Sequence, residues 1–413
     1  MQVEFPHDFL WGTATAAHQV EGNNVNSDLW VLEHLPETIF SEPSGDACDH
    51  YHRYPQDIAL LAELGFNTYR FSIEWARVEP EEGHFSQAAI DHYKRMLLAC
   101  HENGIKPMVT FHHFTSPRWL IPSGGWTNAD TAAKFARYCG HTTRCLGDMI
   151  DWVCTINEVN IPRMIALLQR FPDPEEGDGR MLNFMQAAMQ ALGPAETPFG
   201  PFLFAISKEG RDVILAAHEQ AVSAIKAERD DLPVGLTIAM TDWQALAGGE
   251  ANRDHLRHEI EDVFLEAARN DDFLGVQTYT RRQVGPDGPL PPEQGVELTQ
   301  MGYEFWPEAL EATIRYASQV AGVPMIVTEN GIGTTDDTRR LEYYRRALQG
   351  VANCLQHGLD VRGYLAWSAL DNFEWLHGYG PQFGIIAVDR ETQERSVKPS
   401  GQWLSEVARA NGF

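Results

Sequence analysis

Cysteine is scarce and unpatterned in this sequence of 413 residues. The six cysteines include no CxxC pair and follow no regular spacing, whereas disulfide frameworks and structural zinc sites leave such patterns. The N-terminal stretch MQVEFPHDFLWG lacks the basic segment and the long apolar segment of a secretory signal. No apolar run approaches the ~20 residues that span a bilayer. We therefore expect reduced thiols, a cytoplasmic location and no membrane partner.

Basic residues are also few. The chain has 32 Lys and Arg against 58 Asp and Glu, which gives a formal net charge of -26. Nucleic-acid-binding proteins need a surface rich in Lys and Arg, so the charge balance excludes that class of partner. The hydrophobic fraction of 43% and the charged fraction of 22% are those of an ordinary globular protein.

The chain has no low-complexity linker and no break in composition, so we expect a single domain over residues 1–413. What recurs is an amphipathic helix, a glycine and a short apolar strand. In SQAAIDHYKRMLLACHENG, Ser86 is the predicted N-cap and Gly104 the predicted end of the helix. The residues that share its apolar face are Ile90, Tyr93, Leu97 and Cys100.

The same order occurs in YPQDIALLAELG before FNTYRF, and in RLEYYRRALQGVANCLQHG before LDVRGYLAW. Pro55 is predicted to lie in the first turn of the former helix, and Gly65 and Gly358 to end the two helices.

Eight segments read as strands, and most are continuously apolar, as expected when both faces of a parallel sheet are buried. They are Phe9–Ala14, Phe66–Phe71, Pro107–Phe111, Trp152–Ile156, Val234–Ala239, Phe273–Gln277, Met325–Thr328 and Gly363–Trp367. Repeated strand–helix units in a chain of this size predict an α/β fold, a (β/α)8 TIM barrel. An open doubly wound sheet is the alternative, but no GxGxxG follows the first strand.

Polar and aromatic residues follow the predicted strands at their C-terminal ends, where the active sites of such barrels lie. They are Arg70, His112, His113, Asn157, Glu158, Asp242, Gln277, Tyr279, Glu329, Asn330 and Trp367. A ring of acids, amides and aromatic residues is typical of a sugar-binding site.

Two glutamates end apolar strands in the same way, Glu158 in DWVCTINE and Glu329 in VPMIVTENGIG. Burying a carboxylate is costly unless it is compensated, so each could have a structural partner such as an Arg or a helix N-terminus. Two facing carboxylates are also the minimal apparatus of a glycosidase. Arg70 could keep one of them ionised, while the less compensated acid would stay protonated.

With these residues in place, the chain resembles glycoside hydrolase family 1, the β-glucosidase/β-galactosidase family of retaining enzymes. The resemblance runs nearly end to end. The matching segments are FPHDFLWGTATAAHQVEG, CDHYHRYPQDIALLAELGFNTYRFSIEWARVEPEEG, TINE, VTENG, WSALDNFEW and FGIIAVD.

The resemblance implies that Glu158 is the catalytic acid/base and Glu329 the nucleophile. It implies that Asn157 holds the sugar 2-hydroxyl and that Trp367 is the stacking floor. Arg70 and Tyr279 match residues that contact and orient the nucleophile. The residues expected to bind the other hydroxyls are Gln19, His112, Glu374 and Trp375.

The sequence departs from the family pattern at several points. Val159 replaces the usual Pro after the acid/base, and Gln277 replaces a more common Asn. HHFTSPRWL replaces a more common HWDLP-like stretch, which leaves His113 without a family role. Members that act on 6-phosphorylated sugars carry a Ser/Lys/Tyr set in the loop that here has Glu374 and Trp375, so we expect unphosphorylated substrates.

His50 and His52 in DHYHRY, with the adjacent pair His112 and His113, raise the alternative of a metallohydrolase. The family carries DHYHRY as scaffold and two carboxylates suffice, so we expect no metal and no cofactor. The predicted function is hydrolysis of small β-glucosides by a retaining exo-β-glycosidase, with β-galactosides and β-fucosides as further candidate substrates. The alternatives are a transglycosidase using the same covalent intermediate and a non-catalytic sugar-binding barrel.

Overall fold

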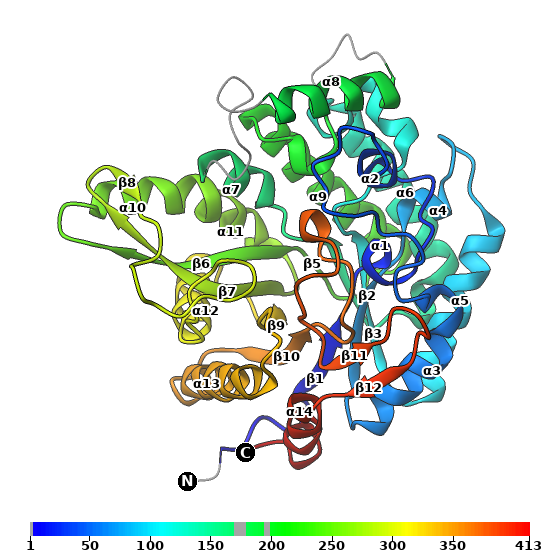
Figure 1. The fold of residues 1–413 in the computed structure, drawn as a ribbon. Helices are drawn as coiled ribbons and strands as arrows, with labels where there is room; N and C mark the ends of the chain where they lie inside the picture. The colour runs from blue at the N-terminus through cyan, green and yellow to red at the C-terminus, as the bar shows by residue number, and fades with distance from the viewer. Residues whose placement is uncertain (1–2, 169–178, 194–198) are drawn as a thin grey trace.

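A ring of parallel strands forms the centre of the computed structural model, which describes residues 3–168, 179–193 and 199–413 (Figure 1). The strands of the ring are β1 (Leu10–Ala14), β2 (Thr68–Ser72), β3 (Lys106–His112), β4 (Trp152–Ile156), β5 (Val234–Gly235), β6 (Thr237–Ala245), β7 (Leu274–Gly285), β9 (Met325–Asn330) and β10 (Val361–Trp367). Each pairs in parallel with its neighbours in the order β5-β4-β3-β2-β1-β10-β9-β7-β6. The predicted (β/α)8 barrel is confirmed, and the open sheet is not observed.

The fifth predicted strand differs from the expectation, because it is two strands. β5 pairs with β4, whereas β6 pairs with β7, and Leu236 separates them. One stretch of chain thus joins both ends of the strand order and closes the ring. The strand also continues six residues past the predicted end at Ala239, and β7 likewise runs beyond Gln277 to Gly285.

Helices surround the ring and alternate with its strands along the chain. The longer ones are α3 (His50–Glu63), α5 (Gln87–Glu102), α6 (Asp130–Leu146), α8 (Arg180–Leu192), α9 (Lys208–Glu228), α12 (Ala309–Val320), α13 (Asp337–Gln356) and α14 (Pro399–Ala410). Shorter elements are α1 (Ala17–Val20), α2 (Asp28–Glu33), α4 (Trp75–Val78), α7 (Ile161–Leu167), α10 (Glu250–Arg257), α11 (Val263–Ala267), β8 (Gly288–Pro289), β11 (Ile386–Val388) and β12 (Arg395–Val397). Within the described residues, every helix is too short or too polar to cross a membrane.

The caps of α5 confirm the sequence reading. The Ser86 side chain accepts from the Ala89 amide, the predicted apolar face is buried, and Gly104 has a φ of 71°. The prediction that Pro55 lies in the first turn of its helix was wrong, because α3 begins at His50 and Pro55 lies in the second turn. At the start of the same helix, His50 Nδ1 is 2.8 Å from Asp57 Oδ2.

The interior of the barrel is filled by side chains from several strands, as in other (β/α)8 barrels. The cluster consists of Leu10, Met108, Cys154, Phe273, Ile326 and Leu365, each at most 3% exposed. A far larger apolar cluster packs between the strands and the outer helices. These two layers fix the strand ends, where the polar residues lie.

Candidate active site

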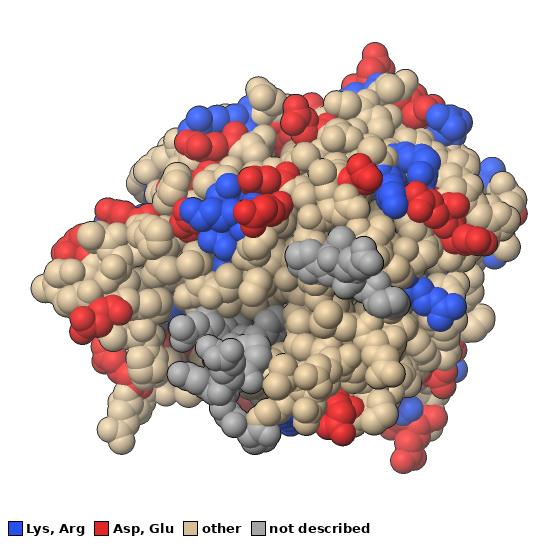
Figure 2. Space-filling model, turned by 90° about the horizontal axis from the view of Figure 1, so that it is seen from above, with Lys and Arg blue, Asp and Glu red and all other residues tan. Residues whose placement is uncertain are grey.

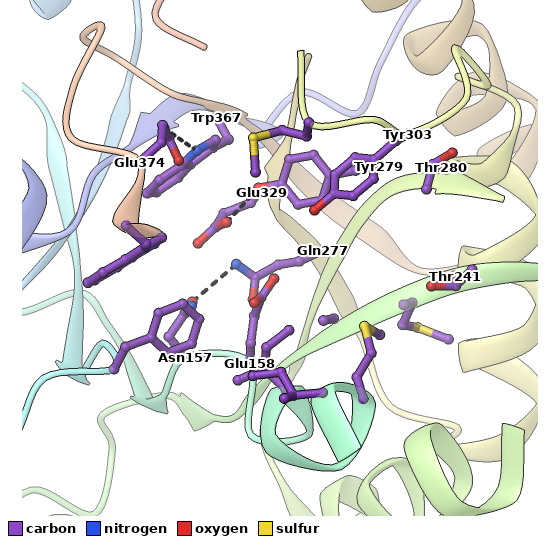
Figure 3. Close-up of a pocket in the computed structure, with 18 of the residues that line it drawn as sticks. Asn157, Glu158, Thr241, Gln277, Tyr279, Thr280, Tyr303, Glu329, Trp367 and Glu374 are labelled. Atoms are coloured by element: carbon purple, nitrogen blue, oxygen red, sulfur yellow. Dashed lines mark hydrogen bonds between the residues drawn. The ribbon is translucent and has the colours of Figure 1, made fainter. Parts of the chain in front are cut away.

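A cavity of about 430 Å³ lies at the C-terminal ends of the strands, within the range of small-molecule sites. Most of the predicted residues line it, and Figure 3 shows several of them directed toward its centre. The predicted residues in its wall are Asn157, Glu158, Tyr279, Glu329, Trp367, Glu374 and Trp375. Among the described residues around the cavity there is no lysine. On the face seen in Figure 2, Lys and Arg lie among Asp and Glu and form no continuous basic surface.

Glu329 is the last residue but one of β9, and its buried carboxylate accepts from two donors. Arg70 Nη1 lies 2.6 Å from its Oε1, and the Tyr279 hydroxyl donates to its Oε2 at 2.7 Å. Burial raises the pKa of Glu329, while the Arg70 charge and the Tyr279 hydrogen bond act in the opposite direction. These contacts offset the free-energy cost of burying a charge at the end of a strand, and they orient both carboxylate oxygens.

Arg70 comes from β2 and is fully buried behind the cavity rather than in its wall. Its Nε donates to Thr110 Oγ1 at 3.0 Å, and its Nη2 donates to Asn157 Oδ1 at 2.5 Å. A buried cation is tolerated only when its donors are satisfied. Arg70 therefore ties the end of β9 to the end of β4.

Asn157 and Glu158 follow β4. Asn157 Oδ1 also accepts from Gln277 Nε2 at 3.1 Å (Figure 3). It accepts from Thr237 Oγ1 at 3.2 Å as well. Its Nδ2 is buried and has no partner among the described residues, so it is the atom left to donate to a ligand. The Glu158 amide donates to Thr237 Oγ1 at 3.0 Å, so the same threonine positions both residues.

Three residues of the cavity wall have positive φ although none is glycine. They are Phe114 at 68°, Glu158 at 44° and Trp375 at 49°. Such backbones cost about 1–3 kcal/mol each and gather at functional sites. Gly331 shows a related constraint, because a Cβ there would lie 1.9 Å from the Trp367 carbonyl oxygen. Only glycine lets the loop after Glu329 pass so close to β10.

The opposite end of the cavity is built from the loop after β10. Trp367 Nε1 donates to Glu374 Oε1 at 3.3 Å, and burial raises the pKa of Glu374 well above its usual range. Gln19 lies behind these residues, where its Nε2 donates to the Phe373 carbonyl at 2.6 Å. Its buried Oε1 has no partner in the described part of the chain. Its predicted contact with a sugar stays a prediction.

The two adjacent histidines lie in different surroundings. His112 is packed against Trp126 and Phe202, and its Nε2 is 2.9 Å from Ser116 Oγ, so it is not part of the cavity wall. Its predicted role in binding sugar stays a prediction. His113 does line the cavity, where its ring is stacked against Trp367 and Trp375.

Sequence reasoning missed two contributors to the site. Thr237 was hidden inside an apolar strand. Gln277 was placed among the polar residues at the strand ends but was given no role, although it bonds Asn157 and lies opposite Glu329 in the register of β7 and β9. The wall from α7 was also missed, although IPRMI directly follows Asn160. Asp242, by contrast, lies within β6 and outside the cavity wall.

No group of three or more His, Cys, Asp or Glu side chains in the described residues is arranged to hold a metal ion. His50 is instead paired with Asp57, and His52 with Asp49. The expectation that the protein uses no metal and no cofactor stays a prediction.

Comparisons with known proteins agree with this geometry. The model of glycosyl hydrolase family 1 matches residues 1–199 and 267–413. The chain is 31% identical to the Beta-glucosidase A of Acetivibrio thermocellus, over 100% of both chains. It is 31% identical to the Bifunctional beta-D-glucosidase/beta-D-fucosidase of Bifidobacterium breve, over 98% of both. The crystal structure of beta-glycosidase BGL167 matches with a TM-score of 0.94 and 58% identity, covering 98% of this chain and 97% of that one.

A family model over most of the chain, full-length relatives and the same fold together show that the protein is a glycoside hydrolase and belongs to glycosyl hydrolase family 1.

Proposed function

We propose that the protein is a retaining, exo-acting β-glucosidase that hydrolyses small unphosphorylated β-glucosides. β-Galactosides and β-fucosides are further proposed substrates. The observation that carries the proposal is the pairing of Glu158, after β4, with Glu329, at the end of β9, in the wall of one cavity. The relatives named β-glucosidase or β-glucosidase/β-fucosidase support it.

In the first step, Glu158 donates a proton to the glycosidic oxygen while Glu329 attacks the anomeric carbon. The bond to the leaving group breaks as the glycosyl–Glu329 ester forms. Arg70 and Tyr279 favour the ionised form of Glu329 and orient it for this attack. Glu158 then takes a proton from water, which displaces Glu329 and releases the sugar. Two inversions give net retention, and the carboxyl groups of a retaining pair are about 5–5.5 Å apart.

The roles proposed for the remaining residues follow their chemistry. Asn157 Nδ2 lacks a partner among the described residues and is proposed to donate to the 2-hydroxyl. Trp367 is the proposed stacking floor, because an indole matches the apolar face of a pyranose. Neutral donor–acceptor groups and a carboxylate suit the other hydroxyls. The residues proposed for them are Gln19, His112, Glu374 and Trp375.

The direct test is release of glucose from 4-nitrophenyl β-glucoside by the wild-type protein. A non-catalytic sugar-binding barrel would bind glucose without releasing nitrophenol. A transglycosidase would transfer the glucosyl group to an added alcohol in preference to water, which product analysis detects.

A phosphorylated sugar is expected to be a poor substrate. Glu374 and Trp375 occupy the relevant loop, and the described cavity wall has no lysine; its one arginine, Arg282, comes from β7 rather than from that loop. Burying an anion without a paired cation in that loop costs about 3–5 kcal/mol, so kcat/KM for 4-nitrophenyl β-glucoside 6-phosphate should be at least about 10²-fold lower than for 4-nitrophenyl β-glucoside. Equal values for the two 4-nitrophenyl glycosides would contradict the prediction.

The leaving group is expected to be apolar, because the acid/base residue is followed at once by α7. Ile161, Met164 and Ile165 share the face of α7 that lines the cavity, and Met240 from β6 also lines it. In the series from methyl to hexyl β-glucoside, each buried methylene should raise kcat/KM by up to about fourfold. A flat series, or a preference for cellobiose over hexyl β-glucoside, would contradict this expectation.

The hydrogen bond from Tyr279 to Glu329 predicts a pH effect. Tyr279→Phe removes a donor that lowers the pKa of Glu329, so that pKa rises. The nucleophile must be ionised, and the acid limb of the kcat/KM profile should therefore move to higher pH by about 1–2 pH units. Tyr138→Phe is the matched control, since its buried hydroxyl donates to the Ile73 carbonyl at 2.9 Å. An unmoved acid limb in Tyr279→Phe would be evidence against Glu329 as the titrating nucleophile.

The proposed catalytic unit is the whole of residues 1–413, because strands from both ends of the chain complete the ring. A cytoplasmic location also stays a proposal, and the six free cysteines are its support.

A further inference from the structure

His113 is a buried polar side chain in the cavity wall that the mechanism above does not use. It is 4% exposed, and its ring is stacked against two indoles that also line the cavity. Its ring centroid is 5.8 Å from that of Trp367, at an interplanar angle of 27°, and 6.0 Å from that of Trp375, at 24°. The ring is therefore held nearly parallel to the surfaces against which a sugar would pack.

The ring nitrogens of His113 form no hydrogen bond within the described part of the chain, and Nδ1 is fully buried. A buried polar group without a partner costs free energy, so in a native structure it indicates a bound ligand or another partner. His112 differs in part: its Nδ1 is also without a partner among the described residues, but its Nε2 is 2.9 Å from Ser116 Oγ and it lies outside the cavity wall. His113 lies in the cavity wall, where a ligand can supply the missing partner.

The surroundings also set its charge. Burial, the Arg70 guanidinium and the neighbouring His112 hold the pKa of His113 well below its usual range. A neutral imidazole has one N–H donor and one acceptor nitrogen, as does a sugar hydroxyl. It suits an uncharged hydroxyl, and because it carries no charge it forms no ion pair with a carboxylate.

We propose that His113 is a specificity-determining residue that hydrogen-bonds one hydroxyl of the bound sugar at the end of the cavity formed by Trp367 and Trp375. This inference rests on the proposed function. The 2-hydroxyl is assigned to Asn157, next to the reacting carbon. The hydroxyl bound by His113 is therefore the one at C3, C4 or C6.

The test compares wild type and His113→Phe on 4-nitrophenyl β-glucoside and its 3-deoxy, 4-deoxy and 6-deoxy analogues. Phe keeps the planar ring and its stacking but removes both nitrogens. We expect kcat/KM on the parent substrate to fall about tenfold, mainly through KM, as loss of one hydrogen bond predicts. On one of the three deoxy substrates the same substitution should change kcat/KM by less than about twofold, because the partner hydroxyl is already absent.

His113→Gln, which restores a donor and an acceptor, should recover part of the loss on the parent substrate. It also supplies the comparison if the Phe variant does not fold. His92→Phe is the matched control. His92 lies in α5, is 3% exposed and has an Nε2 that is likewise unpartnered among the described residues. Its ring is stacked on that of Tyr51, with 3.7 Å between the ring centroids.

An unchanged kcat/KM in His113→Phe would overturn the proposal. So would an equal loss on the parent and all three deoxy substrates, because that pattern reflects a distorted site rather than one lost bond. Failure of the proposed function is seen separately, as absence of turnover by the wild type. In that case, the ¹⁵N shifts of the His113 ring with and without glucose decide whether it binds a hydroxyl.

Discussion

Glu329→Gln should lower kcat on 4-nitrophenyl β-glucoside by about 10⁴-fold or more, as loss of a covalent nucleophile does in other enzymes. The amide has nearly the shape of the carboxylate but cannot attack the anomeric carbon. It also leaves the buried Arg70 without its anionic partner at 2.6 Å. The measurement is kcat with circular dichroism as a check of folding.

The product that a Glu329 variant forms with an added nucleophile identifies the role of Glu329. In Glu329→Ala, added azide can enter the vacated space and attack the face of the sugar that Glu329 would have attacked. A single inversion then gives an α-glucosyl azide. Glu79→Gln is the matched control, since Glu79 is a fully buried carboxylate paired with Arg137 and lies outside the cavity wall. A Glu329→Ala variant that hydrolyses the substrate normally would exclude it as the nucleophile.

Glu158→Gln is the second large effect, and its size should depend on the leaving group. An alkyl β-glucoside needs a proton on its leaving oxygen, so kcat/KM should fall by about 10²–10⁴-fold. With 2,4-dinitrophenyl β-glucoside, whose leaving group needs no proton, kcat/KM should stay close to wild type. Release of the sugar from Glu329 is then slow, because the base that activates water is missing, and a burst of dinitrophenol should precede the steady state.

The anomer of the azide product also distinguishes the role of Glu158 from that of Glu329. In Glu158→Ala it attacks the glycosyl–Glu329 ester in place of water, and the second inversion gives a β-glucosyl azide. Equal losses on alkyl and dinitrophenyl substrates would contradict the assignment of Glu158 as the acid/base.

Much of the fold was predictable, because apolar strands, helix caps and glycine stops repeat in a regular order. Ser86 and Gly104 mark the ends of α5 through a side-chain cap and a positive φ, and both depend only on the residue and its neighbours in sequence. The division of the fifth strand at Leu236 was not predictable, since it depends on which neighbouring strand each half pairs with. Pro55 was misplaced because its preference for a first turn was outweighed by a helix that starts at His50.

The catalytic pair was predictable for a different reason, since a charge at the end of a buried strand needs an explanation. The contacts that position the two glutamates and their neighbours could not be predicted from the sequence. Thr237 contacts both Asn157 and Glu158 from a strand 80 residues away in sequence. The separation of His112 from His113 likewise depends on the packing of Trp126 and Phe202, which adjacent sequence positions do not reveal.

The measurement that tests the central claim most directly is proton NMR of the first sugar released from 4-nitrophenyl β-glucoside, recorded before mutarotation. Retention through a glycosyl–Glu329 intermediate predicts that β-glucose forms first and that the signal is lost in Glu329→Gln. Early α-glucose would show a single inversion and would contradict the roles assigned to Glu158 and Glu329.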